Sequence, residues 1–211
     1  MENALPWGRL PNSEYLDRHW LAHAFLQDFN LIDVWACPAA GGPTVRLEDF
    51  LRYLTDTEPC CLAGLFHMVR DDLGRKIQGK PFSFAPPSRP MPGCSETGIA
   101  QRLPANLQGT ALGTRILNKF SDIYYTEDES MFEGPASVGH LVYHFGRVSI
   151  GDDSKGQWYV QVTILAKTFG KKADLWMSLI NPVRQTLIYP NLVRQWGLSF
   201  SKQRQCQSSR H

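Results

Sequence analysis

The hydrophobic pattern of the chain changes near Gly170 from a period of two residues to a period of about 3.6. Before this point, the segments 120–126, 137–150 and 157–169 alternate apolar and polar residues, as half-buried strands do. After it, apolar residues recur at spacings of three and four over 172–196, which predicts a long amphipathic helix. Strands followed by a long helix predict an α+β fold in which an antiparallel sheet packs on that helix.

The apolar side of the predicted helix is the surface that we expect to meet the sheet. It consists of Trp176, Leu179, Ile180, Val183 and Leu187, while Ser178, Asn181 and Gln185 fall on the opposite side. Pro182 and Pro190 each remove a backbone donor and clash with the preceding turn, so we expect a kink or local break near each. A kinked helix over a sheet leaves space beneath it, which predicts a ligand cavity between the two.

The last two predicted strands are antiparallel neighbours, because the Gly- and Asp-rich segment 151–156 joins them as a hairpin turn. If Ser149 faces Gln157, the even-numbered residues of both strands share one face, and that face includes His140 and His144. Valines alternate with these histidines, so we expect both imidazoles to point toward the C-terminal helix. Each buried imidazole then needs a hydrogen-bond partner or an open cavity in front of it.

The first half of the chain has weaker signals. Residues 1–20 are predicted to be an irregular lead-in, and 29–37 a strand. The segments 44–57 and 59–77 are predicted to be helices. The Pro-rich segment 80–93 is either a lid over a pocket or an inert surface loop.

Composition narrows the class of protein. The chain has 211 residues, of which 43% are hydrophobic, and this is typical of one globular domain. We expect that domain over 21–197, followed by a disordered polar tail over 198–211. A net charge of +2 argues against nucleic acid as a partner, and no apolar run approaches the ~20 residues of a membrane span. Five cysteines without C-x-x-C spacing, and a first segment unlike a signal peptide, predict a cytoplasmic protein.

Four stretches of the chain resemble a known family. They are DVWACP at 33–38, YYTEDE at 124–129, HLVYHFG at 140–146, and INPVR at 180–184 with Tyr189-Pro190. In this order they resemble a domain of unknown function in the superfamily of START lipid-transfer and polyketide cyclase/aromatase proteins (SRPBCC). The resemblance covers about residues 12–196. It implies a helix-grip fold, in which an antiparallel sheet wraps a long C-terminal helix and encloses a cavity for an apolar ligand.

His140 and His144 are the candidate catalytic residues. Four positions apart on a strand, they lie about 13 Å from one another, too far to bind one metal ion. We therefore predict no metal at this pair, and the chain is also predicted to need no cofactor. Each imidazole can act alone as a general acid or base, and the alternative is a hydrogen-bonded core histidine. Their expected partners are Asp122, Tyr124 and Tyr125, whereas Glu127, Asp128 and Glu129 are expected to form a solvated turn.

The candidate ligand-binding residues are mostly aromatic or apolar. They are Trp35, Tyr125, Trp158, Trp176, Ile180, Arg184 and Leu187. Arg184 either binds a carboxylate or phosphate group or extends to the surface along its own stem.

Three functions remain open on this basis. The first is binding of a small apolar molecule, with or without proton-transfer chemistry. The second is a cofactor-independent cyclase or isomerase in which His140 or His144 moves a proton. The third is an interaction domain whose core is filled by side chains. A homodimer is compatible with each.

Overall fold

The computed structural model describes residues 7–41, 45–55, 98–117, 120–136, 139–150, 157–168 and 171–208. The expected helix at 59–77, the Pro-rich segment 80–93 and the hairpin turn at 151–156 lie outside the described residues.

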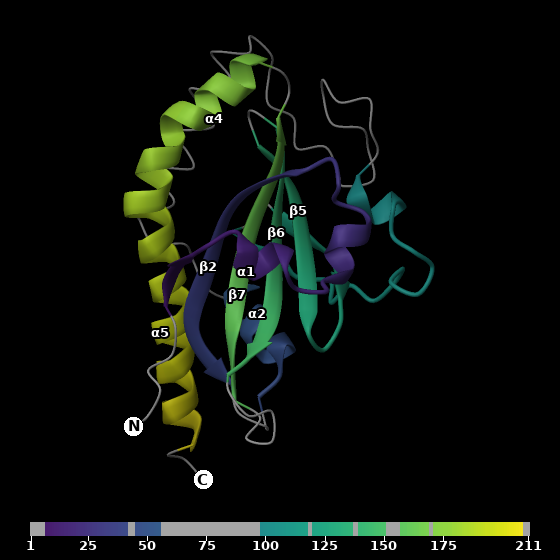
Figure 1. The fold of residues 1–211 in the computed structure, drawn as a ribbon. Coiled ribbons are helices and arrows are strands. Elements are labelled where there is room, and N and C mark those ends of the chain that lie inside the picture. Colours follow the sequence, from purple (N-terminus) through teal and green to yellow (C-terminus); the bar gives the residue numbers. More distant parts are fainter. Residues whose placement is uncertain are drawn as a thin grey trace.

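The described residues form an α+β fold built on a seven-stranded sheet in which every neighbouring pair is antiparallel (Figure 1). The strands are β1 (Gly8–Leu10), β2 (Asn30–Gly41), β3 (Arg115–Ile116), β4 (Phe120–Tyr125), β5 (Glu129–Ala136), β6 (Gly139–Ser149) and β7 (Trp158–Thr168). Their order across the sheet is β1-β2-β7-β6-β5-β4-β3. The predicted α+β class and antiparallel sheet are confirmed. The lead-in expected to be irregular contains β1.

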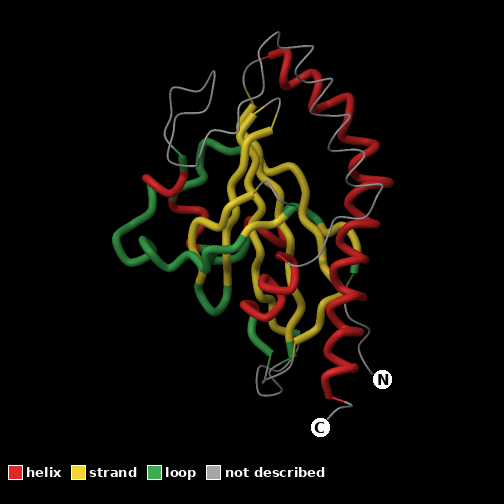
Figure 2. The backbone as a smooth tube through the Cα atoms, turned by 180° about the vertical axis from the view of Figure 1, so that it is seen from behind, coloured by secondary structure: helices red, strands yellow, loops and turns green. Residues whose placement is uncertain are grey.

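Helical elements lie on both faces of the sheet (Figures 1 and 2), and an apolar cluster fills the space on each face. The helical elements are α1 (Ser13–Leu16), η1 (Leu21–Ala24), α2 (Leu47–Thr55), η2 (Ile99–Gln101), α4 (Lys171–Val183), η4 (Arg184–Ile188) and α5 (Tyr189–Ser208). Residues of α2, α4 and α5 pack on one face, which we call the helix face. Residues of α1, η1 and η2 pack on the other, which we call the N-terminal face.

The long C-terminal helix is confirmed, and it extends further than predicted. Helices α4 and α5 are joined by η4, a five-residue π-helical segment that begins two residues after Pro182 and ends two residues before Pro190. The local break expected near each proline is therefore present, because both residues disturb the regular hydrogen-bond ladder. The expected disordered tail is wrong for 198–208, which continue α5. Phe200 is buried there against Phe50, with ring centroids 5.3 Å apart.

The register between β6 and β7 differs by one residue from the predicted one. Ser149 lies opposite Trp158, and the N–H of Ile150 donates to the carbonyl of Gln157 at 2.9 Å. Odd-numbered residues of β6 therefore share the helix face with even-numbered residues of β7: Leu141, Tyr143, Phe145, Trp158, Val160, Val162 and Ile164. His140 and His144 point to the N-terminal face. Their predicted direction, toward the C-terminal helix, was wrong because both faces of β6 are buried, so the valines that alternate with the histidines do not mark the helix face.

The C-terminal helix also turns a different side to the sheet than predicted. Ile180 is buried, but Leu179, Val183 and Leu187 are 63%, 42% and 53% exposed. The helix instead turns two polar side chains toward Asp33 of β2. Gln185 Nε2 donates to Asp33 Oδ1 at 2.8 Å, and Arg184 Nη2 lies 3.7 Å from Asp33 Oδ2.

The ion pair between Arg184 and Asp33 is fully buried, and both side chains have zero exposure. Arg184 also donates to Asn181 Oδ1 and lies over the ring of Tyr189, 5.3 Å from its centroid. Burial raises the pKa of Asp33 above its ordinary value, although the positive charges of Arg184 and Arg9 oppose this shift. The expected extension of Arg184 to the surface is therefore wrong, and the carboxylate that its buried guanidinium meets is Asp33, which joins the helix to the sheet.

Candidate functional site

The candidate site is built around a buried pair formed by His144 of β6 and Glu129, the first residue of β5. Glu129 lies opposite Gly146 in the register, which places its side chain diagonally beside His144 on the same face. Nε2 of His144 and Oε2 of Glu129 are 2.8 Å apart, and the side chains are 0% and 3% exposed. The other oxygen, Oε1, accepts a hydrogen bond from the backbone N–H of Leu21 at 2.8 Å.

Local hydrogen bonds in the β4–β5 turn fix the position of Glu129. The hydroxyl of Thr126 accepts from the N–H of Glu129 and donates to its carbonyl, both at 3.1 Å. The N–H of Arg147 on β6 donates to the carbonyl of Asp128 at 2.7 Å. The expectation of a solvated turn holds for Glu127 and Asp128, which are exposed, and is wrong for Glu129.

A second buried pair repeats the same arrangement four residues along each strand. His140 Nε2 and Glu133 Oε2 are 2.8 Å apart, with side chains 5% and 2% exposed. Glu133 also accepts a hydrogen bond from the N–H of Ile99 at 2.8 Å, and Phe29 stacks edge-on against His140 at 5.1 Å. The prediction that both histidines are buried with a hydrogen-bond partner is confirmed. Their partners are glutamates of β5, not the expected Asp122, Tyr124 or Tyr125.

Aromatic side chains from the N-terminal segment enclose His144. The rings of Tyr15 and Trp20 meet its imidazole edge-on, with centroids 5.4 Å and 5.1 Å away, and His23 stacks on Tyr15 at 4.7 Å. Burial and the negative charge of Glu129 raise the pKa of Tyr15, so its phenol stays protonated. Burial and the neighbouring His144 lower the pKa of His23.

Burial and the negative charge of Glu129 also raise the pKa of Tyr124. A protonated phenol at this position can donate a hydrogen bond to a carboxylate. Within the described part of the chain, Nδ1 of His144 has no hydrogen-bond partner although it is buried. The pair is thus buried in an environment of low dielectric constant, where the hydrogen bond between its two side chains is stronger than it would be in water.

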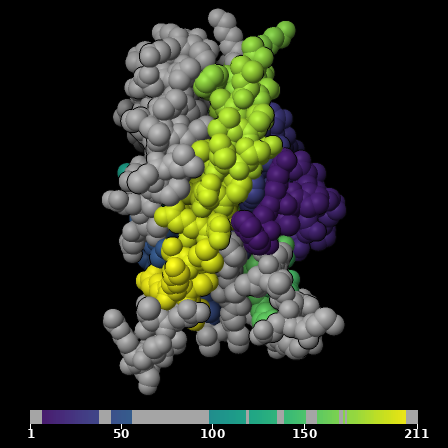
Figure 3. Space-filling model, turned by 90° about the vertical axis from the view of Figure 1, so that its left-hand side faces the viewer, coloured from purple at the N-terminus to yellow at the C-terminus, as the bar shows by residue number. Residues whose placement is uncertain are grey.

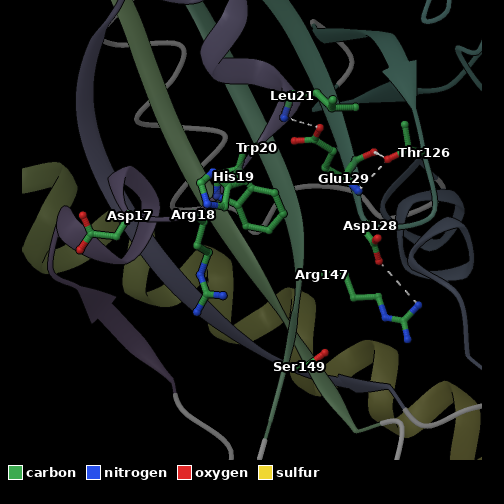
Figure 4. A pocket seen from close by; sticks show the side chains of 10 residues that line it. All are labelled: Asp17, Arg18, His19, Trp20, Leu21, Thr126, Asp128, Glu129, Arg147 and Ser149. Atoms are coloured by element: carbon green, nitrogen blue, oxygen red, sulfur yellow. Dashed lines mark hydrogen bonds and ion pairs between the residues drawn. The ribbon is translucent and has the colours of Figure 1, made fainter. Parts of the chain in front are cut away.

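Glu129 connects the buried pair to a pocket of about 750 Å³ that is largely open to solvent and that we call the cavity (Figure 4). The cavity lies between the N-terminal segment and the ends of β5 and β6. Its lining residues are Asp17, Arg18, His19, Trp20, Leu21, Thr126, Asp128, Glu129, Arg147 and Ser149. In Figure 4, Glu129 projects toward the backbone of Leu21, and Arg147 lies beside Asp128. The cavity therefore joins a carboxylate of the pair to charged and aromatic groups of both signs.

Gly146 makes room for Trp20 above this pair. A Cβ atom built on Gly146 would lie 2.5 Å from Cη2 of the Trp20 indole, closer than packed atoms approach. Because Gly146 is two residues after His144 on the same face, its missing side chain lets the indole reach both the imidazole and the cavity.

Gly146→Ala is therefore expected to displace the Trp20 indole and to lower the free energy of unfolding by about 1–3 kcal/mol, as overpacking does. Urea unfolding measures this loss. In a Trp20→Leu background the added methyl group has space, so the same substitution is expected to cost less than about 1 kcal/mol. Equal costs in the two backgrounds would show that Trp20 does not pack on Gly146.

The structure separates the predicted ligand-binding residues from the predicted catalytic ones. Trp35, Trp158 and Ile180 are buried in the core on the helix face, and Tyr125 and Trp176 are partly buried against it. Leu187 is exposed, so its expected place in a cavity under the helix was wrong. His140 and His144 lie on the other face with Glu129 and Glu133.

Sequence reasoning missed most residues around the two histidines, among them Glu129, Glu133 and Trp20. A signal for the two glutamates was present. They are four residues apart, as are His140 and His144, and the two sets flank the connection between neighbouring antiparallel strands. Trp20 left no comparable signal, because its place depends on packing of the lead-in against the sheet.

Neither a metal-binding cluster nor a membrane-spanning helix occurs among the described residues. They contain no group of three or more His, Cys, Asp or Glu residues arranged to hold a metal ion. None of the helices they form is long and apolar enough to cross a membrane.

Comparisons with protein-family models, with curated proteins and with solved structures found no significant match to this chain.

Proposed function

We propose that this protein binds a small molecule in the cavity beside Glu129 and that the Glu129–His144 pair transfers a proton on the bound molecule. The observation that carries the proposal is a buried carboxylate–imidazole pair with one member in the wall of a 750 Å³ cavity. Buried titratable pairs in a cavity of this size are typical of ligand and catalytic sites.

The lining suggests the kind of ligand. Arg18 and Arg147 offer positive charge, Asp17 and Asp128 negative charge, and Trp20 an aromatic surface. Arg147 is held by Asp128 at 3.9 Å, a long ion pair for which a ligand can compete. These groups fit a conjugated molecule with polar substituents better than the purely apolar ligand expected from the sequence.

The chemistry that the pair fits is an isomerisation without a cofactor. The Glu129 carboxylate removes a proton from carbon or oxygen of the ligand, and the same proton returns to another atom of the ligand. His144 holds the carboxylate in place through Nε2, and the backbone N–H of Leu21 fixes the second oxygen. The proton balance closes within the pair and the ligand, so no other reactant is needed.

A model base-catalysed reaction tests this proposal without knowledge of the natural ligand. The probe 5-nitrobenzisoxazole opens to a coloured phenolate when a base removes its ring proton. We expect the full-length protein to accelerate this reaction, and Glu129→Gln to lower kcat/KM by roughly 10²- to 10⁴-fold. Quenching of tryptophan fluorescence by the probe gives its affinity separately from the chemical step.

Glu133→Gln is the matched control, since Glu133 forms an equivalent buried pair but does not line this cavity. We expect this variant to keep the rate of the wild-type protein within about threefold. Equal losses in both variants would assign the effect to destabilisation. A wild-type rate no higher than that of free acetate and imidazole would contradict the proton-transfer role.

The helix-grip assignment is part of the same proposal. It is supported by the sequence resemblance and by a long C-terminal helix on an antiparallel sheet. A ligand cavity between that helix and the sheet stays a prediction.

A further inference from the structure

Residues 13–24 cover the buried pair of Glu129 and His144 from the outside. They contain α1 and η1, connect β1 to β2 across the N-terminal face, and carry the rings of Tyr15 and Trp20 that meet the imidazole of His144. In the space-filling view, the N-terminal part of the chain (purple) lies on the surface beside the C-terminal helix, with no other element over it (Figure 3). We call residues 13–24 the covering segment.

The covering segment is fixed at both ends but weakly held between them. Before it, β1 pairs with β2. After it, Asp28 accepts hydrogen bonds from Lys167 at 2.7 Å and from Arg102 at 2.9 Å. Of the twelve residues of the covering segment, only Tyr15 and Ala22 are buried. A segment that buries so few apolar side chains between two fixed ends can open while the rest of the protein stays folded.

The two surfaces that meet beneath the covering segment are poorly matched in hydrogen bonds. On the sheet, Thr163 lies opposite His144, and Gln161 donates to the carbonyl of Glu14. Within the described residues, six buried polar atoms at this contact have no partner: Tyr15 Oη, Trp20 Nε1, His23 Nε2, His144 Nδ1, Gln161 Oε1 and Thr163 Oγ1. Folded proteins leave only a few such atoms per 100 residues. Each gains hydrogen bonds from water when it is exposed, so the mismatch favours opening.

Glu129 ties the covering segment to the buried pair. Its Oε1 accepts a hydrogen bond from the N–H of Leu21 at 2.8 Å, and its Oε2 lies 2.8 Å from Nε2 of His144. Five of the ten residues that line the cavity belong to the covering segment. Opening of this segment therefore widens the cavity and exposes Nδ1 of His144 to it.

We propose that the covering segment is a lid that opens to admit the ligand to the Glu129–His144 pair, and that the hydrogen bond from Leu21 to Glu129 is its latch. The purpose of the lid rests on the proposed function, whereas its opening can be tested without a ligand. The carboxylate that closes the lid is also the group that acts on the ligand. A ligand that binds Glu129 thus competes with Leu21 and shifts the lid toward its open state.

Glu133 provides a comparison within the same fold. It forms the equivalent buried pair with His140, but its carboxylate accepts a hydrogen bond from the N–H of Ile99 on η2, outside the covering segment. Weakening of this hydrogen bond is therefore expected to loosen η2 and to leave the lid closed.

Labelling of a buried thiol with iodoacetamide measures the opening of the lid. In Thr163→Cys the thiol lies beneath the covering segment, because Thr163 is fully buried and faces His144 across the strands. Val162→Cys is the matched control, since Val162 is the preceding residue of β7 and equally buried, but on the helix face. Mass spectrometry of peptides separates both positions from the five natural cysteines.

Urea unfolding of each variant gives the labelling rate that global unfolding alone allows. We expect the thiol at position 163 to react roughly 10²-fold faster than this rate or more, and the thiol at position 162 to react at about this rate. Glu129→Gln is expected to raise the excess at position 163 by about threefold or more, because Leu21 then donates to a neutral acceptor in place of a charged one. Glu133→Gln is expected to leave the excess within about twofold.

Three results would overturn the lid. The first is labelling at position 163 that is no faster than global unfolding allows. The second is an excess that Glu129→Gln does not change, or that Glu133→Gln raises equally. The third is labelling as fast as in an unfolded peptide, since the segment would then not cover the pair. No ligand enters this experiment, so its failure is distinct from a failure of the reaction with 5-nitrobenzisoxazole.

Discussion

Glu129→Ala is expected to lower the free energy of unfolding by about 3–5 kcal/mol, the usual cost of removing one partner from a buried pair. The effect is large because the substitution removes two hydrogen-bond partners at once. Nε2 of His144 loses its partner at 2.8 Å. The N–H of Leu21 loses the acceptor through which it fixes the N-terminal segment to β5. Each group left buried without a partner costs the full free energy of its desolvation. Urea denaturation followed by circular dichroism measures the change.

A double-variant cycle identifies the cause of this loss. In the double variant Glu129→Leu/His144→Leu, two apolar side chains replace the pair. We expect it to recover at least half of the stability that Glu129→Leu alone loses. His144→Leu alone is expected to be as harmful as Glu129→Ala, because it leaves the carboxylate buried. Losses that simply add in the double variant would show that the two side chains are not energetically coupled.

Arg184→Met is expected to destabilise the protein by a comparable amount, about 3–5 kcal/mol. The substitution keeps most of the volume of the side chain but leaves Asp33 buried without the positive charge at 3.7 Å. Arg9→Met is the matched control. Arg9 also pairs with Asp33, at 3.0 Å, but its side chain is 49% exposed, so we expect a loss below about 1 kcal/mol.

The deficit of Arg184→Met is expected to depend on pH. Burial already raises the pKa of Asp33, and removal of Arg184 raises it further. A raised pKa stabilises the folded state below the unfolded value of 3.8, and that contribution is lost as the pH rises through the folded pKa. Denaturant midpoints should therefore differ most from wild type near pH 7 and least below pH 3.8. A deficit that does not change with pH would mean that Asp33 does not carry the effect.

Local pattern predicted the elements well but not their relative positions. Alternation identified β4, β6 and β7, and the spacing of apolar residues identified the long helix, because both signals lie within one segment. The face that each strand presents depends on register, which is set between segments. A shift of one residue at Ser149 changed which β7 residues share a face with His140 and His144, and burial of both faces of β6 left the alternating valines unable to indicate their direction.

The helix shows a similar limit. The predicted apolar side of 172–196 included Leu179 and Val183, which are exposed, whereas the buried side of α4 is formed by Ala173, Met177 and Ile180, so apolar spacing alone did not identify the side that meets the sheet. Burial of Arg184 against Asp33 also depends on a contact 151 residues away along the chain, for which the helix sequence itself holds no signal. The candidate site was recognised only in its two histidines for the same reason, since their partners come from another strand.

The strand order has a consequence for how the chain folds during synthesis. β2 pairs with the three-residue β1 on one edge and with β7 on the other, and β7 follows roughly 120 residues later. At synthesis rates of about 5–20 residues per second, one edge of the twelve-residue β2 stays open on the ribosome for several seconds. An open edge of this length is a template for wrong pairing with other chains. The inner edge of β2 can therefore be paired only after β7 has been synthesised.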